Sequence, residues 1–191
     1  MRLVKPVFAA RLILGLFACA KPPQAEIDAA KAAVAKAAAN SDVVTYASEA
    51  LARAQDALSR MQTELTAKKY DKVKTLALEA SAAAEKAITD AAANKAKVKA
   101  DAEALIAAMK KKLPEAEKTI AAAKRIPRTG LNFTALAKAL TGARASLTQA
   151  DADYANGNFM AAWNKATGVQ TALADSQKTV ADAVQAATKK K

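Results

Sequence analysis

The 191-residue chain carries a formal net charge of +12, and 52% of its residues are hydrophobic although only 4% are aromatic. It has no histidine and one cysteine, which excludes the common zinc, haem and cysteine–histidine catalytic sites. Gly and Pro number five each, and alanine, the best helix former, supplies most of the apolar content. We therefore expect an all-α protein without a cofactor and without enzymatic activity.

The amino terminus has the layout of a secretory signal peptide. Basic residues in 1–18 precede a short apolar run, which ends at Ala18 and Cys19. The run is too short for a permanent membrane span, which needs about 20 apolar residues. We predict a signal peptide at 1–18 and, because two prolines disfavour helix there, an extended tether at 19–23. This layout alone leaves two simple interpretations of Cys19: a small residue next to an ordinary cleavage site, or a buried free thiol.

The segment Leu16-Phe17-Ala18-Cys19 resembles the lipobox of bacterial lipoproteins. The resemblance implies cleavage before Cys19 and attachment of fatty acyl chains such as palmitate, so that the exported protein is anchored to a membrane of the cell envelope. Ala20 and Lys21 lack the aspartate that some bacteria use for inner-membrane retention. This favours the outer membrane, with the protein facing the periplasm.

Breaks in the helical pattern predict an elongated antiparallel bundle of about six helices. Pro114 is expected to open or kink the fourth helix. We predict one three-helix unit at 24–112, with a long third helix, and a second at 113–191, with a basic C-terminal tail. The expected helices are 24–39, 45–67, 70–112, 114–125, 132–155 and 159–188.

An internal repeat supports this division into two units. Apolar residues of the second expected helix recur 89 residues later, and the aromatic residue after its turn recurs at the same shift; a shift of 91 relates Pro23 to Pro114. Chance matching between alanine-rich helices is the alternative. The steps of four and three residues predict left-handed, coiled-coil-like packing at an alanine-rich seam. The pairs are Ala47, Leu51, Ala54, Leu58, Met61, Leu65 and Tyr70 with Leu136, Leu140, Ala143, Leu147, Ala150, Tyr154 and Phe159.

The segment from Gly157 to Ala166 resembles the loop and second helix of a tetratricopeptide repeat, and Lys68, Tyr70, Val73 and Ala77 give a weaker version. The chain is also similar to an uncharacterised family of alanine-rich helical bacterial lipoproteins with such hairpins. Both resemblances imply a scaffold or a binding role.

Charge and one aromatic residue supply the candidate contacts. Lysines gather in several clusters, and the mature chain would keep +9 after loss of three basic residues in the signal. This charge favours anionic partners such as lipid headgroups or cell-wall polymers. The alternative is that the lysines only keep an alanine-rich bundle soluble and monomeric. Nucleic acid is excluded as an expected partner, because aromatic residues are not interleaved with the basic ones. Trp163, next to a core position, is a candidate partner contact or a half-buried packing residue.

Two functions follow as hypotheses. The first is a non-enzymatic, membrane-anchored scaffold that binds another envelope protein. The alternative is a structural tether between membrane and cell wall, through the basic surface or through Lys191. An amino-terminal lipid with a carboxy-terminal lysine is similar to the small outer-membrane lipoprotein crosslinked to peptidoglycan, although that protein is a much shorter single helix.

Overall fold

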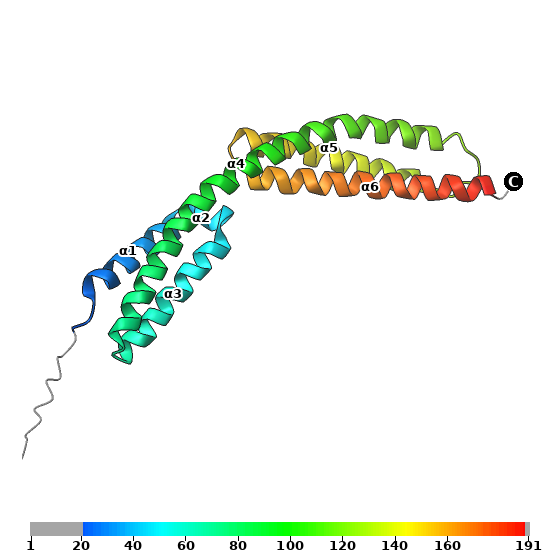
Figure 1. Cartoon of the computed structure of the whole chain (residues 1–191). Helices are drawn as coiled ribbons and strands as arrows, with labels where there is room; N and C mark the ends of the chain where they lie inside the picture. The colour runs from blue at the N-terminus through cyan, green and yellow to red at the C-terminus, as the bar shows by residue number, and fades with distance from the viewer. Residues whose placement is uncertain (1–20, 190–191) are drawn as a thin grey trace, which may run out of the picture.

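The computed structural model describes residues 21–189, and this part of the chain contains helices and no strands (Figure 1). The prediction of an all-α fold is confirmed. Cys19, the expected signal peptide at 1–18 and Lys191 lie outside the described residues. The helices are α1 (Gln24–Ala39), α2 (Ser41–Tyr46), α3 (Ser48–Thr66), α4 (Tyr70–Ala123), α5 (Phe133–Ala155) and α6 (Phe159–Lys189).

The helices form two bundles that follow one another along α4 (Figure 1). In the first bundle α1 and α3 pack on the amino-terminal part of α4; in the second, α5 and α6 pack on its carboxy-terminal part. Each bundle has its own core. The first core uses α4 residues up to Ala91, and the second begins at Ala102.

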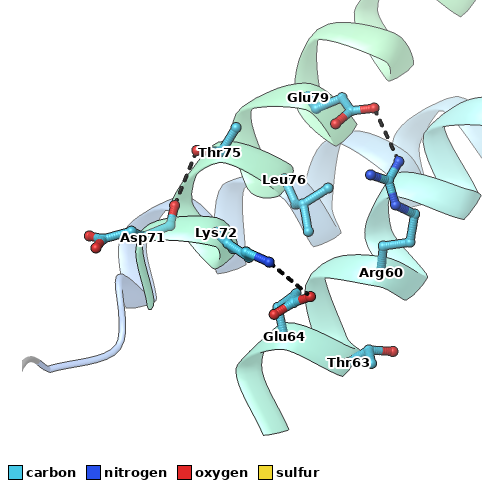
Figure 2. A pocket seen from close by; sticks show the side chains of 8 residues that line it. All are labelled: Arg60, Thr63, Glu64, Asp71, Lys72, Thr75, Leu76 and Glu79. Carbon is cyan, nitrogen blue, oxygen red and sulfur yellow. Dashed lines mark hydrogen bonds and ion pairs between the residues drawn. The ribbon is translucent and has the colours of Figure 1, made fainter. Parts of the chain in front are cut away.

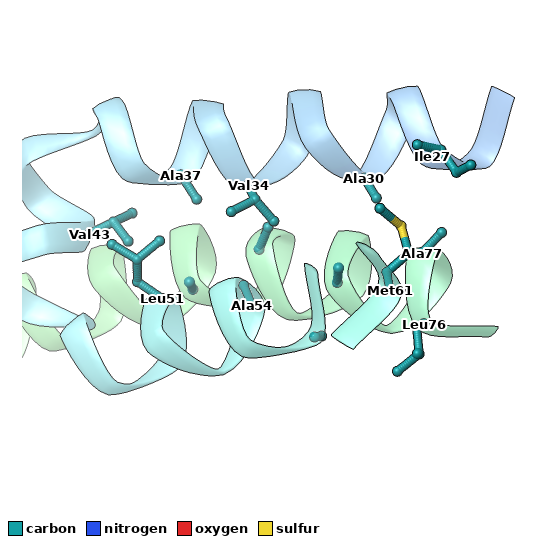
Figure 3. Packing of buried hydrophobic residues seen from close by; sticks show 14 of the residues in the cluster. Ile27, Ala30, Val34, Ala37, Val43, Leu51, Ala54, Met61, Leu76 and Ala77 are labelled. Carbon is teal, nitrogen blue, oxygen red and sulfur yellow. The ribbon is translucent and has the colours of Figure 1, made fainter. Parts of the chain in front are cut away.

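Alanine dominates the first core (Figure 3). Ile27 and Val34 of α1, together with Met61 of α3, supply larger side chains. The α4 side of the same core is mostly alanine, whose small side chain lets helix backbones approach closely while each contact buries little area. At the α3 seam Ala54, Ala57 and Met61 are fully buried, whereas Leu58 is only partly buried.

Helix α4 is continuous through Pro114, so the expectation of a helix ending at Lys112 and a new one opening at Pro114 was wrong. Proline lacks the N–H that would bond to the preceding turn. Here its ring is on the exposed face, while the adjacent Leu113 and Ala116 are buried in the second core and hold the helix in place. The expected unit boundary between 112 and 113 thus falls inside a helix.

Helix α2 is the element that the sequence did not predict. The segment from Asn40 was expected only to stop α1, but Asn40 also begins α2, because its side chain accepts a hydrogen bond of 2.9 Å from the backbone N–H of Asp42. Val43, fully buried, fixes this short helix to the first core.

The shift of 89 residues recurs in the pattern of burial. Helix α4 begins at Tyr70 and α6 at Phe159, and every buried position in the first part of α4 has a buried counterpart in α6, apart from Leu76. This agreement in three dimensions favours true repetition over chance. The paired residues are Val73, Ala77, Ala80, Ala84, Ala87 and Ala91 with Ala162, Ala166, Val169, Leu173, Ser176 and Val180.

The shift of 91 residues that relates Pro23 to Pro114 is not reproduced. Pro23 precedes α1, whereas Pro114 lies within α4. The buried positions of α1 instead match those at the end of α4 at a shift of 86 residues. The apolar residues, and not an exposed proline, determine which face of a helix points into the core. The buried residues Ile27, Ala30, Val34 and Ala37 correspond to Leu113, Ala116, Ile120 and Ala123.

The turns before α4 and α6 share one backbone geometry. Lys68 and Gly157, 89 residues apart, have positive φ angles of 56° and 80°. In each turn the next residue donates its N–H to a carbonyl five residues back, over 3.0 Å from Lys69 to Glu64 and 2.8 Å from Asn158 to Asp153. This is the Schellman arrangement, which normally places glycine at the left-handed position.

Replacement of Lys68 with glycine should therefore stabilise the protein by about 1 kcal/mol, because lysine is strained where glycine is not. The matched change Gly157→Ala should destabilise it by about the same amount; an added Cβ meets no atom within 4 Å, so the cost is in the backbone. Chemical denaturation of both variants measures the two effects. Equal stability of Lys68→Gly and the parent chain would contradict the strain assigned to Lys68.

Candidate interaction surfaces

Trp163 lies on α6 and is 37% exposed. It lines a shallow hollow of about 450 Å³ between α4 and α6, opposite Leu105 and Ala108. The indole is therefore partly packed and partly accessible, which suits either of the two roles expected from the sequence. Its neighbour Ala162 is fully buried, as the helical spacing predicted.

A larger groove of about 500 Å³ lies between α3 and α4 in the first bundle (Figure 2). Its charged walls pair across the two helices: Arg60 lies 3.6 Å from Glu79, and Lys72 lies 3.9 Å from Glu64. Leu76 supplies an apolar surface between these pairs (Figure 2). The pairs bridge α3 and α4 over an open groove, an arrangement that braces the hairpin.

Glu64 is less exposed to solvent than the other acidic residues that line this groove. Its side chain is only 23% exposed, and its Oε2 atom is buried without a hydrogen-bond donor among the described residues. The Nζ atom of Lys69 lies 3.5 Å from this oxygen. The carboxylate is therefore neutralised by ion pairs at the end of the hairpin rather than by short hydrogen bonds.

The junction between the bundles is formed where α2 meets the linking segment of α4, residues 92–101, which contains no fully buried residue. The side-chain amide of Asn94 donates to the carbonyl oxygen of Tyr46 at 2.8 Å. The Nζ atom of Lys95 lies 2.9 Å from both carboxylate oxygens of Asp42. The hydrogen bond with Asp42 raises the pKa of Lys95 above its usual value.

On the second bundle, aromatic residues meet the same helix. The hydroxyl of Tyr154 donates to Glu103 at 2.9 Å, and this hydrogen bond, with burial and the nearby charge, raises the pKa of Tyr154. The ring centroids of Tyr154 and Phe159 are 5.2 Å apart, and the Nζ atom of Lys99 is 5.6 Å from the centroid of Phe159. Lysines of the linking segment thus take part in internal contacts.

A hollow of about 470 Å³ separates α2 from the turn between α5 and α6. One wall is formed by Asp42 and Tyr46, and the other by Gly157, Met160 and Asn164. The end of the second bundle therefore faces α2 of the first bundle at close range. Sequence reasoning missed this junction because the residues that meet there are far apart in the chain.

Replacement of Lys95 with methionine should release α2 from α4 and speed amide hydrogen exchange in Ser41–Tyr46. Global stability should change little, because both side chains of the pair are partly exposed to solvent, which screens their interaction. The matched control is Lys97→Met, since Lys97 pairs with Asp101 within α4 itself. Unchanged exchange in α2 for Lys95→Met would contradict the role of this ion pair.

The same contact has a defined pH dependence. Because the pKa of Lys95 is raised in the folded protein, the contribution of its ion pair is complete below the ordinary value of 10.5 and is lost as the pH rises through the raised value. Loosening of α2 at alkaline pH should therefore be absent from the Lys95→Met variant.

Among residues 21–189, no group of three or more potential metal-ligating side chains lies together, and no helix is long and apolar enough to cross a membrane. The close acidic residues Asp151 and Asp153 pair separately, with Lys110 at 2.8 Å and with Lys165. Residues two positions apart lie on different sides of a helix, which is consistent with these separate partners.

Comparison with known proteins identifies one similar domain. Residues 25–104 match the family model described as a domain of unknown function (DUF4398). The match covers the first bundle and the linking segment, and it ends where the second core begins. No curated protein and no solved structure matches the chain.

Proposed function

We propose that this protein is a non-enzymatic lipoprotein of the bacterial envelope, anchored through Cys19, whose two helical bundles act as a scaffold for another envelope protein. The observation that carries the proposal is the placement of the chain ends. The start of α1 and the end of α6 lie at opposite ends of the molecule (Figure 1). An anchor before α1 would therefore hold the second bundle away from the membrane.

Helix α4 sets the size of this spacer. It contains 54 residues, and a helix rises 1.5 Å per residue, which gives a length of about 81 Å. Internal ion pairs such as Lys86 with Asp90 and Lys97 with Asp101 support the helix along its exposed face. A spacer of this kind suits a protein that presents a binding surface at a distance from the membrane. The resemblance of the hairpin sequences to tetratricopeptide repeats also implies a scaffold or binding role.

The anchor is tested by replacement of Cys19 with serine. The variant should lose incorporation of a labelled fatty acid and move from the membrane to the soluble fraction, because serine provides no thiol for the thioether. Replacement of Ala20 with serine is the matched control, since it places a hydroxyl next to the thiol without removing it. Membrane retention of a processed Cys19→Ser chain would overturn the proposal of a lipid anchor.

The scaffold role is tested at the half-exposed Trp163. A photo-crosslinking amino acid at position 163 should capture a distinct envelope protein in intact cells, identified by mass spectrometry. The control is the same amino acid at Leu78, a 57% exposed position on the first bundle. Identical products from the two positions would contradict a specific surface on the second bundle.

A structural tether to the cell wall is the second candidate, favoured by the position of the α6 end opposite the proposed anchor. A covalent tether predicts a peptide containing Lys191 attached to muropeptides after muramidase digestion. Deletion of Lys191 should abolish that product. Its absence from the full-length chain would eliminate the covalent form of this function.

A further inference from the structure

The two repeats differ sharply in charge at the turn that precedes their last helix. The backbone geometry of the turn is the same in both repeats, and the aromatic residue after it is kept as Tyr70 or Phe159. Three lysines of the first repeat correspond to uncharged, smaller residues in the second. The pairs are Lys68, Lys69 and Lys72 with Gly157, Asn158 and Ala161.

These lysines are not needed to build the turn. The second repeat makes the same hydrogen bonds without them, and Lys68 has a positive φ angle that glycine adopts with less strain. The side chains of Lys69 and Lys72 are 57% and 65% exposed, so they add little to the core. Lys69 and Lys72 neutralise Glu64 within the hairpin, but their side chains are mostly exposed and can also bind an anion outside the fold.

The surroundings of the two turns also differ. In the second repeat the turn faces α2 across the junction hollow, which is lined by Gly157 and Asn158. In the first repeat the same face forms the end of the molecule and borders a surface hollow lined by residues 68–72. The uncharged copy is therefore the one turned toward another part of the chain, and the lysine-bearing copy is turned outward.

The position of the lysine-bearing turn relative to the proposed anchor is fixed by α1. Lys74, in the first turns of α4, lies 3.4 Å from Glu26 of α1, which places the start of α1 beside this end of the hairpin. Cys19 precedes Gln24 by five residues, which reach at most about 18 Å when fully extended. A lipid on Cys19 would hold this turn within reach of the headgroup layer.

Two local acids, Glu64 and Asp71, weaken this positive charge only in part, because three lysines line the same hollow. Glu64 lies 3.5 Å from Lys69 and 3.9 Å from Lys72, longer than a charge-assisted hydrogen bond, so both ammonium groups keep donors for another anion. Lys68 is exposed and makes no ion pair among residues 21–189. Lysines attract an anionic membrane surface only within about a Debye length, roughly 8 to 10 Å, and a tether that extends at most about 18 Å allows the turn to come that close.

We propose that Lys68, Lys69 and Lys72 form a docking face for the headgroups of anionic phospholipids, which orients the first bundle on the membrane that anchors it. The inference rests on the proposed lipid anchor for its geometry. It adds a second, electrostatic contact, which fixes the direction in which the rest of the molecule projects.

The experiment couples the mature chain through Cys19, its one cysteine, to a maleimide-bearing lipid in vesicles. One set of vesicles contains phosphatidylglycerol and the other phosphatidylcholine in its place. Acetylation rates of individual lysines are then read by mass spectrometry. Lys68, Lys69 and Lys72 should react about fivefold more slowly on the anionic vesicles, and high salt should remove the difference.

Lys111 and Lys112 in the same molecule are the internal control, and their rates should not depend on the lipid. Equal slowing of these lysines would mean diffuse attraction of the whole basic chain and would overturn the proposal. Equal slowing on both kinds of vesicle would mean crowding by the tether and would also overturn it. If acetylation of Lys68, Lys69 and Lys72 slowed as the protein concentration rose without vesicles, a second copy of the chain would cover this face, which would overturn the proposal.

A variant that carries the residues of the second repeat, K68G/K69N/K72A, separates docking from folding. It should keep the helix content of the parent chain, because glycine at position 68 relieves backbone strain while loss of the pairs with Glu64 costs stability. Residues 67–69 should lose the slowing of hydrogen exchange that anionic vesicles cause. The control K110Q/K111Q/K112Q has the same change of charge and should keep that slowing. Persistent slowing in K68G/K69N/K72A would exclude the docking face.

The two proposals fail separately. Fatty-acid labelling of Cys19 in cells does not depend on the lysines, and the vesicles supply the anchor chemically. Absence of labelling with intact docking would remove the anchor alone, whereas labelling without protection of the lysines would remove the docking face alone.

Discussion

The continuity of α4 is the constraint on which the rest of the structure depends. One helix of 54 residues provides a wall of both cores, so neither bundle is complete without it. Between the cores, residues 92–101 have no fully buried side chain and depend on the high helix propensity of alanine and lysine. A break there would separate the two bundles, which also face each other across the hollow beside α2. The contacts of Asn94 and Lys95 with α2 reinforce the segment where packing is thinnest.

Alanine at the seams explains why the molecule is long rather than thick. Each alanine buries little surface but permits close approach, so stabilisation accumulates through many small contacts along each helix. Larger side chains such as Met61 and Met109 are few among the fully buried residues. A fold packed in this way leaves little space between its helices. Its surface offers grooves between helices, of which those beside Leu76 and Trp163 are examples.

The parts of the fold that follow helical periodicity were predictable from the sequence, because the alternation of four- and three-residue steps reports burial directly. The relation of Val73 to Ala162 is of this kind. The prediction that a new helix opens at Pro114 failed, because the packing of Leu113 and Ala116 outweighs the local tendency of proline to interrupt a helix. Helix α2 and the junction depend on Lys95 and Asp42, separated by 53 residues, and no local pattern reports such a contact. The charge contrast between the two turns was visible in the repeat, but its meaning required knowing which turn faces outward.

The length of the linking segment 92–101 also determines how the second bundle is rotated about the axis of α4. Each residue added to an α-helix advances it by about 1.5 Å and rotates it by about 100°. One insertion within 92–101 would thus turn the second bundle by more than a quarter revolution about the axis of α4 and would carry Trp163 to another side of the molecule. Changes of seven residues alter the length by about 10.5 Å and nearly restore the facing direction. The length of such a molecule can therefore change only by a nearly whole number of helical turns, for example by about 7, 11 or 18 residues, if its two bundles are to keep their mutual orientation.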